Sequence, residues 1–270
     1  MVMPELPEVE TIVRELRQKL RGDTFTGLKV YWTRTFVKEK KLEVSGQKIK
    51  AVERKGKYII FRLSAGWMIT HLRMTGQLIV DDRPADNRKH LRLSFSLASG
   101  RYLQFYDMRK FGRIYLTADE KTILVNTGLD ALDARFTENY LKELLKNRST
   151  RIKSFLLDQK YIAGLGNIYI DESLFLAGIH PEMPAGKLGK NRVKKLYEAI
   201  QLILAGAIEN MGTTLSDYRT TGGGFGSNQY YLKVYGREEQ SCLVCKTVIK
   251  KIRHAGRGTH FCPTCQPLVL

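Results

Sequence analysis

The sequence predicts an α+β protein, with an antiparallel β-sandwich or barrel behind an N-terminal helix and a second, helical region after it. Apolar residues recur at helical spacing from Val9 to Leu20, alternate in short runs through residues 28–116, and return to helical spacing from about residue 136. All four cysteines lie between positions 242 and 265, which indicates a small metal-binding module near the C-terminus.

The N-terminal helix follows the stretch PELPEVE. Its apolar residues share one face: Val9, Ile12, Val13, Leu16 and Leu20. Pro7 suits the first helical turn, where its missing N–H costs nothing, and Glu8 and Glu10 complement the positive end of the helix. Taken alone, the residues favour a well-formed helix start as the explanation of this stretch.

The middle of the chain reads as strands. KHLRLSFSL places Leu91, Leu93, Phe95 and Leu97 on one face, and GWMITHLRM, GRYLQFYD and FGRIYL indicate further strands. Ser99-Gly100 is expected to form a hairpin turn.

The second region is helical. One apolar face carries Ile152, Phe155 and Leu156, another carries Ile170, Leu174 and Ala177, and a further helix is expected over roughly 190–210. Between the first two helices, the glycines of YIAGLGN permit tight turns, and we expect Asn167 to cap the next helix. The stretch TTGGGFGSNQ has no apolar period and is expected to be a mobile loop.

Charge narrows the class of partner. The chain has 270 residues, which suits one large or two ordinary domains, and we expect two. Its 45 Lys and Arg against 27 Asp and Glu give a net charge of +18, so nucleic acid is the first candidate partner and an anionic membrane the second. No apolar run is long enough for a membrane span and the start is acidic, so we expect a cytosolic or nucleoid-associated protein.

The cysteines form two C-x2-C pairs, Cys242 with Cys245 and Cys262 with Cys265, separated by sixteen residues. This spacing fits a tetrahedral site of four thiolates for one structural Zn2+ per chain. Buried free cysteines or two disulfides are the disfavoured alternatives. His254 and His260 could compete as ligands, but four thiolates leave them no need to bind, and we expect them at the surface or facing phosphate.

Between the two pairs, KKIRHAGRGTH predicts a basic hairpin whose tip carries Arg257 between glycines. Such an Arg can approach a phosphate closely and make paired hydrogen bonds to it. A solvated charged turn is the alternative, and it is the weaker one beside a zinc module in so basic a chain.

HLRMTG and YDMRKFG each place a basic residue beside a large apolar one near a strand end, where Met74, Arg109 and Phe111 could project together. Proteins that unstack DNA use apolar wedges and an Arg in this way. From these residues alone, however, burial of Met74 and Phe111 in the core is the commoner outcome.

The stretches PELPEVET, RKGKY, HLRMTG, YDMRKFG, AGLGNIYIDESLF and AGRGTHFCPTCQ, in this order and across nearly the whole chain, resemble bacterial formamidopyrimidine-DNA glycosylase. Leu6 and HLRM favour this branch over the related endonuclease VIII branch. The resemblance implies three parts: a catalytic β-sandwich domain with the nucleophile helix over 1–130, a helix-two-turn-helix domain with a lesion loop over 131–230, and a zinc finger over 231–270.

The resemblance implies a monomeric, bifunctional glycosylase and AP lyase that removes 8-oxoguanine and formamidopyrimidines from duplex DNA. A proline with a free amine can attack the sugar C1′ and form an iminium ion, which permits β- and δ-elimination. By resemblance, Pro4 is the nucleophile and Glu5 the acid that protonates the sugar ring oxygen. Lys57 is the expected proton donor for β-elimination, and Arg257 is expected to assist δ-elimination.

The resemblance also implies the DNA contacts. His90, Lys153 and Asn167 match phosphate-binding positions, and Ser149 lies on the same basic approach. Met74, Arg109 and Phe111 match the residues that fill the void left by the flipped nucleotide, with Arg109 facing the orphaned cytosine. The segment 213–229 resembles the loop that closes over the everted base.

Two departures from the family pattern stand out. Thr75 follows Met74 where some members have Glu, and the loop is unusually rich in glycine, which leaves the preference between 8-oxoguanine and ring-opened purines open. The chain also begins before Pro4, whose nitrogen would be an amide inside a longer chain and therefore not nucleophilic. We expect the active protein to start at Pro4, with Met1 and Val2 reflecting a misplaced start or a numbering artefact.

A non-catalytic alternative stays open at this point. A damage sensor or regulatory zinc-ribbon protein could keep the fold with a blocked nucleophile, and it would bind lesion DNA without nicking it.

Overall fold

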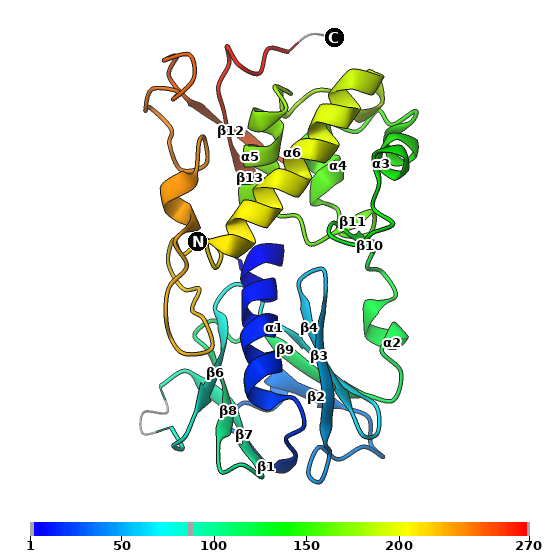
Figure 1. The fold of residues 1–270 in the computed structure, drawn as a ribbon, viewed down its shortest axis with the longest axis vertical. Coiled ribbons are helices and arrows are strands. Elements are labelled where there is room, and N and C mark those ends of the chain that lie inside the picture. The colour runs from blue at the N-terminus through cyan, green and yellow to red at the C-terminus, as the bar shows by residue number, and fades with distance from the viewer. Residues whose placement is uncertain (1–2, 86–88, 269–270) are drawn as a thin grey trace. The chain divides into compact units, whose positions relative to one another are not determined.

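The computed structural model describes residues 3–85 and 89–268 of the chain (Figure 1). The chain folds into two compact units: unit 1 comprises Met1–Asn126 with Ala207–Gln229, and unit 2 comprises Thr127–Gly206 with Tyr230–Leu270. The expectation that Met1 and Val2 are absent from the active protein concerns residues outside those described.

Unit 1 begins with helix α1 (Leu6–Leu20), and its predicted apolar face is fully buried. The helix start is built as the sequence predicts. Pro7 lies in the first turn, and Glu5 and Glu8 form a capping box in which the Glu5 N–H donates to Glu8 Oε2 (2.8 Å). The first turn of α1 therefore holds two acidic side chains next to Pro4.

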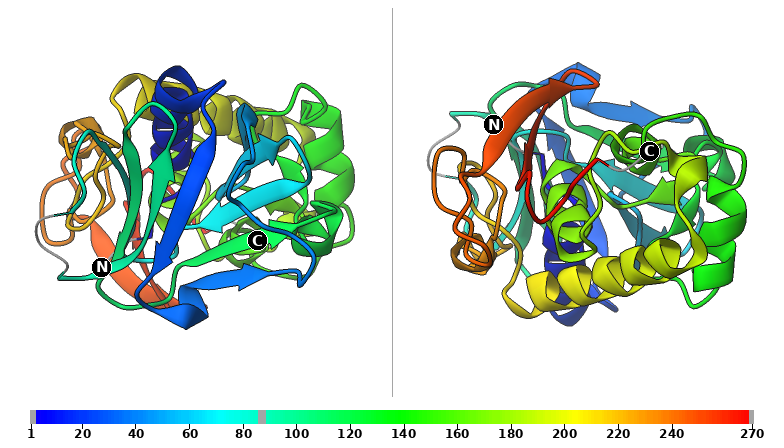
Figure 2. Two further views of the ribbon diagram at one scale, coloured as in Figure 1. Left: turned by 90° about the horizontal axis from the view of Figure 1, so that it is seen from below. Right: turned by 90° about the horizontal axis from the view of Figure 1, so that it is seen from above.

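Two separate sheets follow α1 in unit 1 (Figure 2). The four-stranded sheet has the order β1-β7-β8-β6, with β1 (Phe25–Val30), β7 (Leu91–Leu97), β8 (Tyr102–Asp107) and β6 (Gly76–Asp81). The five-stranded sheet has the order β2-β9-β5-β4-β3, with β2 (Phe36–Lys38), β9 (Arg113–Thr117), β5 (Trp67–His71), β4 (Tyr58–Leu63) and β3 (Ile49–Lys55). Two unlinked sheets make a sandwich rather than a barrel.

The core of the sandwich draws on both sheets and on α1. Phe25 contacts Phe61 of the other sheet (ring centroids 6.5 Å apart) and Phe95 of its own sheet (5.0 Å), and Leu16 packs into the same cluster. The predicted turn at Ser99-Gly100 links β7 and β8, with Gly100 at φ +85°. One pairing differs from the antiparallel expectation, because β2 runs parallel to β9; these strands are distant in sequence and no hairpin joins them. Short elements η1 (Thr33–Thr35) and α2 (Lys121–Leu124) complete this part.

Unit 2 is helical, as predicted, with α3 (Glu138–Leu145), α4 (Ile152–Leu157), α5 (Asn167–Leu176) and most of α6 (Lys190–Glu209). β10 (Leu129–Asp130), which precedes α3, pairs in parallel with β11 (Ile162–Ala163), which lies between α4 and α5 in sequence, and the turn η2 (Ala185–Lys187) precedes α6. The C-terminal hairpin consists of β12 (Lys250–His254) and β13 (Arg257–Phe261). It follows η3 (Asn228–Tyr231) and the first cysteine pair along the chain.

One local prediction is wrong. Gly166, with extended backbone, occupies the cap position of α5, and Asn167 is the first helical residue. The side chain of Asn167 is used elsewhere, since its Nδ2 donates to the carbonyl of Gly258 (2.9 Å). Of the predicted loop 213–229, residues 213–227 form no helix or strand, as expected, whereas its last two residues, Asn228 and Gln229, belong to η3. Within residues 3–85 and 89–268, no helix combines the length and apolar character needed to cross a bilayer.

Candidate active site and nucleic-acid interface

Pro4 is buried at the start of α1 and lines a small pocket of unit 1. The other lining residues are Met3, Glu8, Thr213, Leu215, Ser216, Asp217 and Tyr218. Glu5 is 2% exposed and directly follows Pro4, and its side chain accepts the backbone N–H of Glu8 in the capping box. The pocket therefore joins the N-terminal segment to a part of the chain more than 200 residues away in sequence.

Glu8 fixes the two walls of this pocket to each other. Its Oε2 accepts the Glu5 N–H, and its Oε1 accepts the Thr213 N–H (2.7 Å). Gly212 packs so closely on Glu8 that an added Cβ would lie 2.9 Å from the carboxylate. Tyr218 donates to the Met211 carbonyl (2.9 Å), and burial raises the pKa of this phenol. These hydrogen bonds tie the segment that carries Pro4 and Glu5 to residues 211–218.

Lys57 lies in the tight turn between β3 and β4, beside Gly56 at φ +56°. Its side chain is 6% exposed. The turn is tied to α1 through Arg54, which donates to the Gly56 carbonyl (3.0 Å) and to Glu10 (2.8 Å). Burial would raise the pKa of Glu10, but hydrogen bonds from Arg54 and Arg14 outweigh it and lower the pKa.

His71 ends β5 directly across from Tyr58, and the two rings meet edge to face (4.7 Å). Its Nδ1 accepts the N–H of Arg73, a residue at φ +57°, and so supports the turn that carries Met74. Burial, together with the charges of Arg73 and Lys57, lowers the pKa of His71 to about 3. His71 is therefore neutral at physiological pH.

Met74, Arg109 and Phe111 come together at the surface of unit 1. Arg109 Nη1 lies 3.1 Å from Met74 Sδ, and the guanidinium carbon is 4.7 Å from the centroid of the Phe111 ring. Phe111 is 47% exposed, so the alternative of core burial is wrong for it. The group thus consists of two large apolar side chains with a cation between them.

His90 precedes β7 with a left-handed backbone (φ +66°), and its carbonyl accepts the Asp107 N–H (2.9 Å). Its Nδ1 lies 3.4 Å from Arg92 Nη2. The His90 ring is half-buried. His90 precedes β7 and Arg109 follows β8, and these two strands are neighbours in one sheet.

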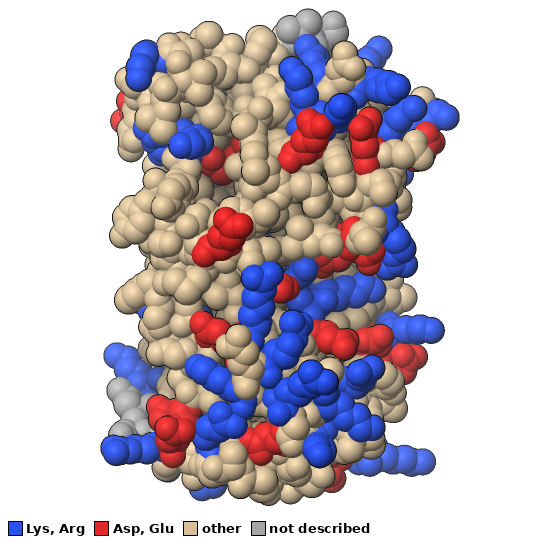
Figure 3. Space-filling view, in the orientation of Figure 1, with Lys and Arg blue, Asp and Glu red and all other residues tan. Residues whose placement is uncertain are grey.

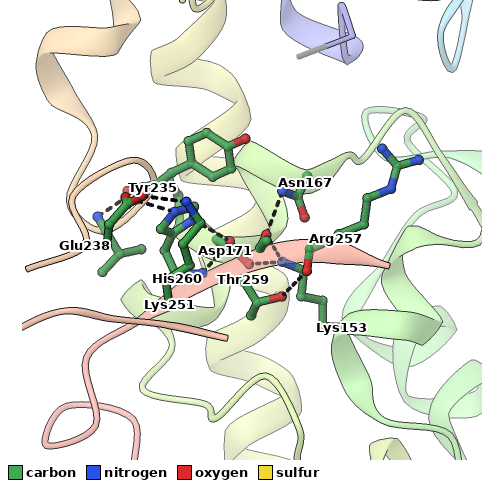
Figure 4. A network of polar contacts seen from close by, with 12 residues as sticks. Lys153, Asn167, Asp171, Tyr235, Glu238, Lys251, Arg257, Thr259 and His260 are labelled. Carbon is green, nitrogen blue, oxygen red and sulfur yellow. Dashed lines mark hydrogen bonds and ion pairs between the residues drawn. The ribbon is translucent and has the colours of Figure 1, made fainter. Parts of the chain in front are cut away.

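Unit 2 contains a buried polar network around Asp171 of α5 (Figure 4). Lys153 of α4 is fully buried, and its Nζ lies 2.6 Å from Asp171 Oδ1 and 3.3 Å from the Gly258 carbonyl. The same carbonyl accepts Asn167 Nδ2. Because α4, α5 and the hairpin all meet here, the position of the hairpin is set by the helices as well as by the cysteines.

Arg257, just past the hairpin tip, is exposed, and Figure 4 shows its guanidinium pointing away from the network. Asn167 is next to it, and the buried Oδ1 of Asn167 has no hydrogen-bond partner within the described part of the chain. Ser149 is exposed in the connection between α3 and α4. Arg257 and Asn167 are thus brought together, whereas the ammonium of Lys153 is already paired.

The two histidines of the hairpin are buried, so the expectation of surface positions is wrong, while a role facing phosphate stays a prediction. His254 is 8% exposed and contacts Ser154 (2.7 Å). His260 is 4% exposed, and its ring nitrogens lie 3.5 Å from Asp171 and 3.2 Å from Glu238 without a hydrogen bond to any described residue. Both side chains fill space between the hairpin and its neighbours.

Sequence reasoning missed Asp171 and Glu172. Glu172 is 2% exposed and accepts the N–H groups of Lys233, Val234 and Tyr235 (2.8–2.9 Å), and burial raises its pKa. The signal was present in NIYIDESLF, where two adjacent acids interrupt an apolar helix and must find partners inside the fold.

The four cysteine sulfurs all lie within 4.8 Å of one another. Cys242 and Cys265 are 3.9 Å apart, and Cys245 and Cys262 are 3.4 Å apart. These separations exceed the roughly 2.05 Å of a disulfide bond and match the roughly 3.8 Å edge of a tetrahedron with Zn–S bonds of about 2.3 Å. Four thiolates fill the coordination of Zn2+, so the ion here is structural.

Lys and Arg side chains gather over the part of unit 1 that contains α1, β3 and β4 (Figure 3). Acidic side chains are interspersed, and Glu10 pairs with Arg14 and Arg54. The net charge of +18 is therefore distributed over folded surface, as the composition predicts.

Three family models match the chain in sequence order. Residues 3–114 match the formamidopyrimidine-DNA glycosylase N-terminal domain, residues 127–219 match the H2TH domain of the same enzymes, and residues 240–268 match a zinc finger found in FPG and IleRS.

Full-length relatives agree with these matches. A formamidopyrimidine-DNA glycosylase from Chloroflexus aggregans is 44% identical over 99% of this chain and 100% of its own length. Among solved structures, a Lactococcus lactis FPG mutant in complex with Fapy-dG-containing DNA superposes with a TM-score of 0.91 at 36% identity, covering 98% of this chain and 100% of that one. The MutM (FPG) protein of Thermus thermophilus gives a TM-score of 0.88 at 37% identity, covering 99% and 100%.

Proposed function

We propose, because the chain belongs to the formamidopyrimidine-DNA glycosylase family, that it is a bifunctional base-excision repair enzyme. It removes 8-oxoguanine and formamidopyrimidines from duplex DNA and then cleaves the strand at the resulting abasic site. The solved relatives bound to Fapy-dG and abasic-site DNA support this substrate class. The observation that carries the proposal is the position of Pro4, which lines a pocket and is flanked by two buried glutamates.

In this proposal Pro4 is the nucleophile. Its free secondary amine attacks C1′ of the damaged nucleotide, the bond from C1′ to the base breaks, and the base leaves with the bonding electrons and a proton. Glu5 protonates the sugar ring oxygen as the ring opens to an iminium ion. Glu8, already committed to two N–H groups, keeps the pocket walls in place.

The iminium ion withdraws electrons and acidifies the hydrogen on C2′. Loss of that proton expels the 3′ phosphate, with Lys57 as the proton donor for β-elimination. A second elimination expels the 5′ phosphate, assisted by Arg257, whose exposed guanidinium can pair with phosphate oxygens. Placing Lys57 in a tight turn anchored to α1 suits a group that has to meet one atom of the substrate.

Each unit also supplies DNA contacts in this proposal. Met74 and Phe111 fill the space of the flipped nucleotide, and Arg109 faces the orphaned cytosine. His90, Asn167 and Ser149 bind phosphates.

Lys153 differs from the other phosphate-binding candidates because its ammonium is paired with Asp171. We infer that Lys153 acts indirectly on the phosphate that Asn167 and Arg257 bind. Its positive charge attracts the phosphate, and its contact with the Gly258 carbonyl holds the backbone beside Arg257 in place. A direct contact would require it to leave a buried carboxylate, which is costly.

The functional parts are proposed to be residues 1–130, 131–230 and 231–270, with structural Zn2+ in the last. We further propose that the protein acts as a monomer in the bacterial cytoplasm, at the nucleoid. The family match and the pocket at Pro4 both favour catalysis over the non-catalytic sensor.

Borohydride trapping tests the proposal. A chain beginning at Pro4 is incubated with a duplex that carries one 8-oxoguanine opposite cytosine, and a matched chain that retains Met3 serves as the control. A covalent adduct and a strand nick are expected only from the chain with the free proline amine. Tight binding by both chains without adduct or nick would establish the non-catalytic sensor instead.

A further inference from the structure

Asp107, at the end of β8, is a fully buried acid that neither the nucleophile pocket nor the phosphate contacts use. It pairs with Gly76 across the β6–β8 ladder. On one side of this position lies the segment 72–76, which carries Met74, and on the other lies 108–112, which carries Arg109 and Phe111. We name these two segments the wedge loops.

The carboxylate of Asp107 binds both wedge loops at once. Its Oδ1 accepts the hydroxyl of Thr75 from the first loop and the N–H of Arg109 from the second (3.1 Å). Its Oδ2 accepts the N–H of Gly112 at the far end of the second loop (2.7 Å). The link is closed by a direct contact, because the Arg109 N–H also lies 3.1 Å from the Thr75 hydroxyl oxygen.

The packing beneath the loops leaves little freedom. A Cβ added at Gly76 would lie 2.9 Å from the Phe105 ring, and one added at Gly112 would lie 2.5 Å from it. Both loops therefore rest on the same buried ring, at positions that only glycine can occupy without displacing it. Thr75 itself is 4% exposed, so its hydroxyl faces the carboxylate and not the solvent.

We propose that Asp107 and Thr75 form a clamp that positions Met74, Arg109 and Phe111 as one preorganised wedge. Through this positioning, Asp107 and Thr75 determine how strongly the protein selects the base opposite the lesion. This inference rests on the proposed function of the wedge. The contact of Arg109 with Met74 and with the Phe111 ring depends on backbone positions that the carboxylate fixes. A side chain held in this way loses less conformational entropy when it meets the orphaned base.

The clamp also gives a role to the residue at position 75. Its hydroxyl donates to Asp107 Oδ1, which ties the first wedge loop to the carboxylate. Thr75→Val keeps the shape of the side chain and removes the hydroxyl, whereas Thr75→Ser keeps the hydroxyl. The Val and Ser variants therefore separate the hydrogen bond from packing.

The experiment compares wild type, Thr75→Val and Thr75→Ser, with Thr117→Val as the matched control. Thr117 is another buried threonine of unit 1 whose hydroxyl is hydrogen-bonded, but it lies in β9 away from the wedge loops. Three quantities are measured: single-turnover excision of 8-oxoguanine opposite cytosine and opposite adenine, lyase activity on a preformed abasic site, and thermal unfolding. Fluorescence of 2-aminopurine beside the orphaned cytosine, in a duplex with a tetrahydrofuran abasic analogue, reports wedge insertion without any chemistry.

Thr75→Val is expected to lower excision opposite cytosine about tenfold, to reduce the cytosine-to-adenine ratio, and to weaken the 2-aminopurine signal, as expected for loss of about one hydrogen bond's discrimination. Lyase activity on the abasic site is expected to stay within about twofold. Thr75→Ser is expected to keep the wild-type ratio of excision opposite cytosine to excision opposite adenine. Thr117→Val is expected to leave this ratio unchanged.

An unchanged ratio and fluorescence signal in a folded Thr75→Val protein would overturn the clamp, as would an equal change in Thr117→Val. Failure of the proposed function looks different, because wild type itself would then neither excise nor cleave. The fluorescence comparison would still decide whether the clamp holds the wedge. Asp107→Asn gives a second measurement, since an amide cannot accept all three donors, and the same loss of selectivity is expected from it.

Discussion

Single residues in unit 1 combine burial with chemistry. His71 is the clearest case, because its ring is neutral while its neighbours Lys57 and Arg73 are cationic. A protonated ring there would add a third positive charge in a buried place. Its neutral Nδ1 instead accepts the Arg73 N–H and holds the turn before Met74.

The pH dependence of stability follows from His71. Its pKa is about 3 in the folded state, against about 6.5 when unfolded, so protons bind more readily to the unfolded chain. This contribution to stability is fully present above about pH 6.5 and is lost as the pH falls towards 3. At pH 5 the loss is about 2 kcal/mol. Urea unfolding at pH 7.5 and pH 5 should show a smaller decrease for His71→Gln than for wild type. Equal decreases would show that His71 does not titrate in this way.

Arg109 supplies a second prediction at the scale of one residue. Arg109→Ala should lower excision opposite cytosine far more than it lowers affinity for undamaged duplex, because it removes one base contact and leaves the basic surface intact. Arg34→Ala, which removes an exposed Arg elsewhere in unit 1, is the control. It should not lower excision opposite cytosine more than it lowers affinity for undamaged duplex. Comparable losses of excision and non-specific binding in Arg109→Ala would make Arg109 an ordinary electrostatic contact.

Elements far apart in sequence hold the hairpin β12–β13 in place. The cysteine pairs provide one attachment, and Phe175 of α5 packs into the same small core as Cys242 and Cys262. The Asp171 network provides another, through Lys153 and His260. A small module with few apolar residues needs both, since its own core is too small to order it.

Cys262→Ser should therefore remove bound zinc and disorder the hairpin. We expect metal analysis of reduced wild-type protein to give about one Zn2+ per chain, and the variant to give much less. Affinity for duplex DNA should fall with it, because Arg257 loses its fixed position. Val244→Ala changes a 71% exposed residue between Cys242 and Cys245, in the other cysteine pair of the same site, and should keep the metal and the affinity. Full metal content in Cys262→Ser would rule out the four-thiolate site.

The whole chain carries a net charge of +18, so its acidic residues can neutralise only part of its Lys and Arg. Of its 45 Lys and Arg, several are committed to internal ion pairs, such as Arg54 with Glu10 and Lys153 with Asp171. Exposed cations such as Arg257 can meet a polyanion. Binding should accordingly be governed by counterion release.

Salt titration tests this property of the molecule. If about six phosphates are neutralised, the logarithm of the association constant should fall against the logarithm of salt concentration with a slope of about −5. Arg257→Ala should make the slope shallower by about one, whereas Asn167→Ala should weaken binding with the slope unchanged, because it removes no charge. A slope near zero in wild type would mean that phosphate neutralisation does not drive binding.

The sequence alone determined the class of fold, the order of its parts and the chemistry of the metal site. These features have local causes. A period of two or 3.6 residues decides strand or helix, and paired cysteines carry their ligand geometry with them. The resemblance carried by six motifs predicted the family, which the comparisons confirmed.

Tertiary structure alone decided how residues distant in sequence share a few buried polar groups. In the sequence Asp107 is only a residue at a strand end, and the structure alone places Thr75 beside it. Lys153 matches a phosphate-binding position, and the structure alone shows it buried against Asp171. Asn167 was expected to cap its own helix, but it reaches Gly258, 91 positions later in the chain. Hydrogen-bond partners of this kind leave no period in the sequence, because they are chosen by the packing of whole elements and by the cost of leaving a buried polar group unpaired.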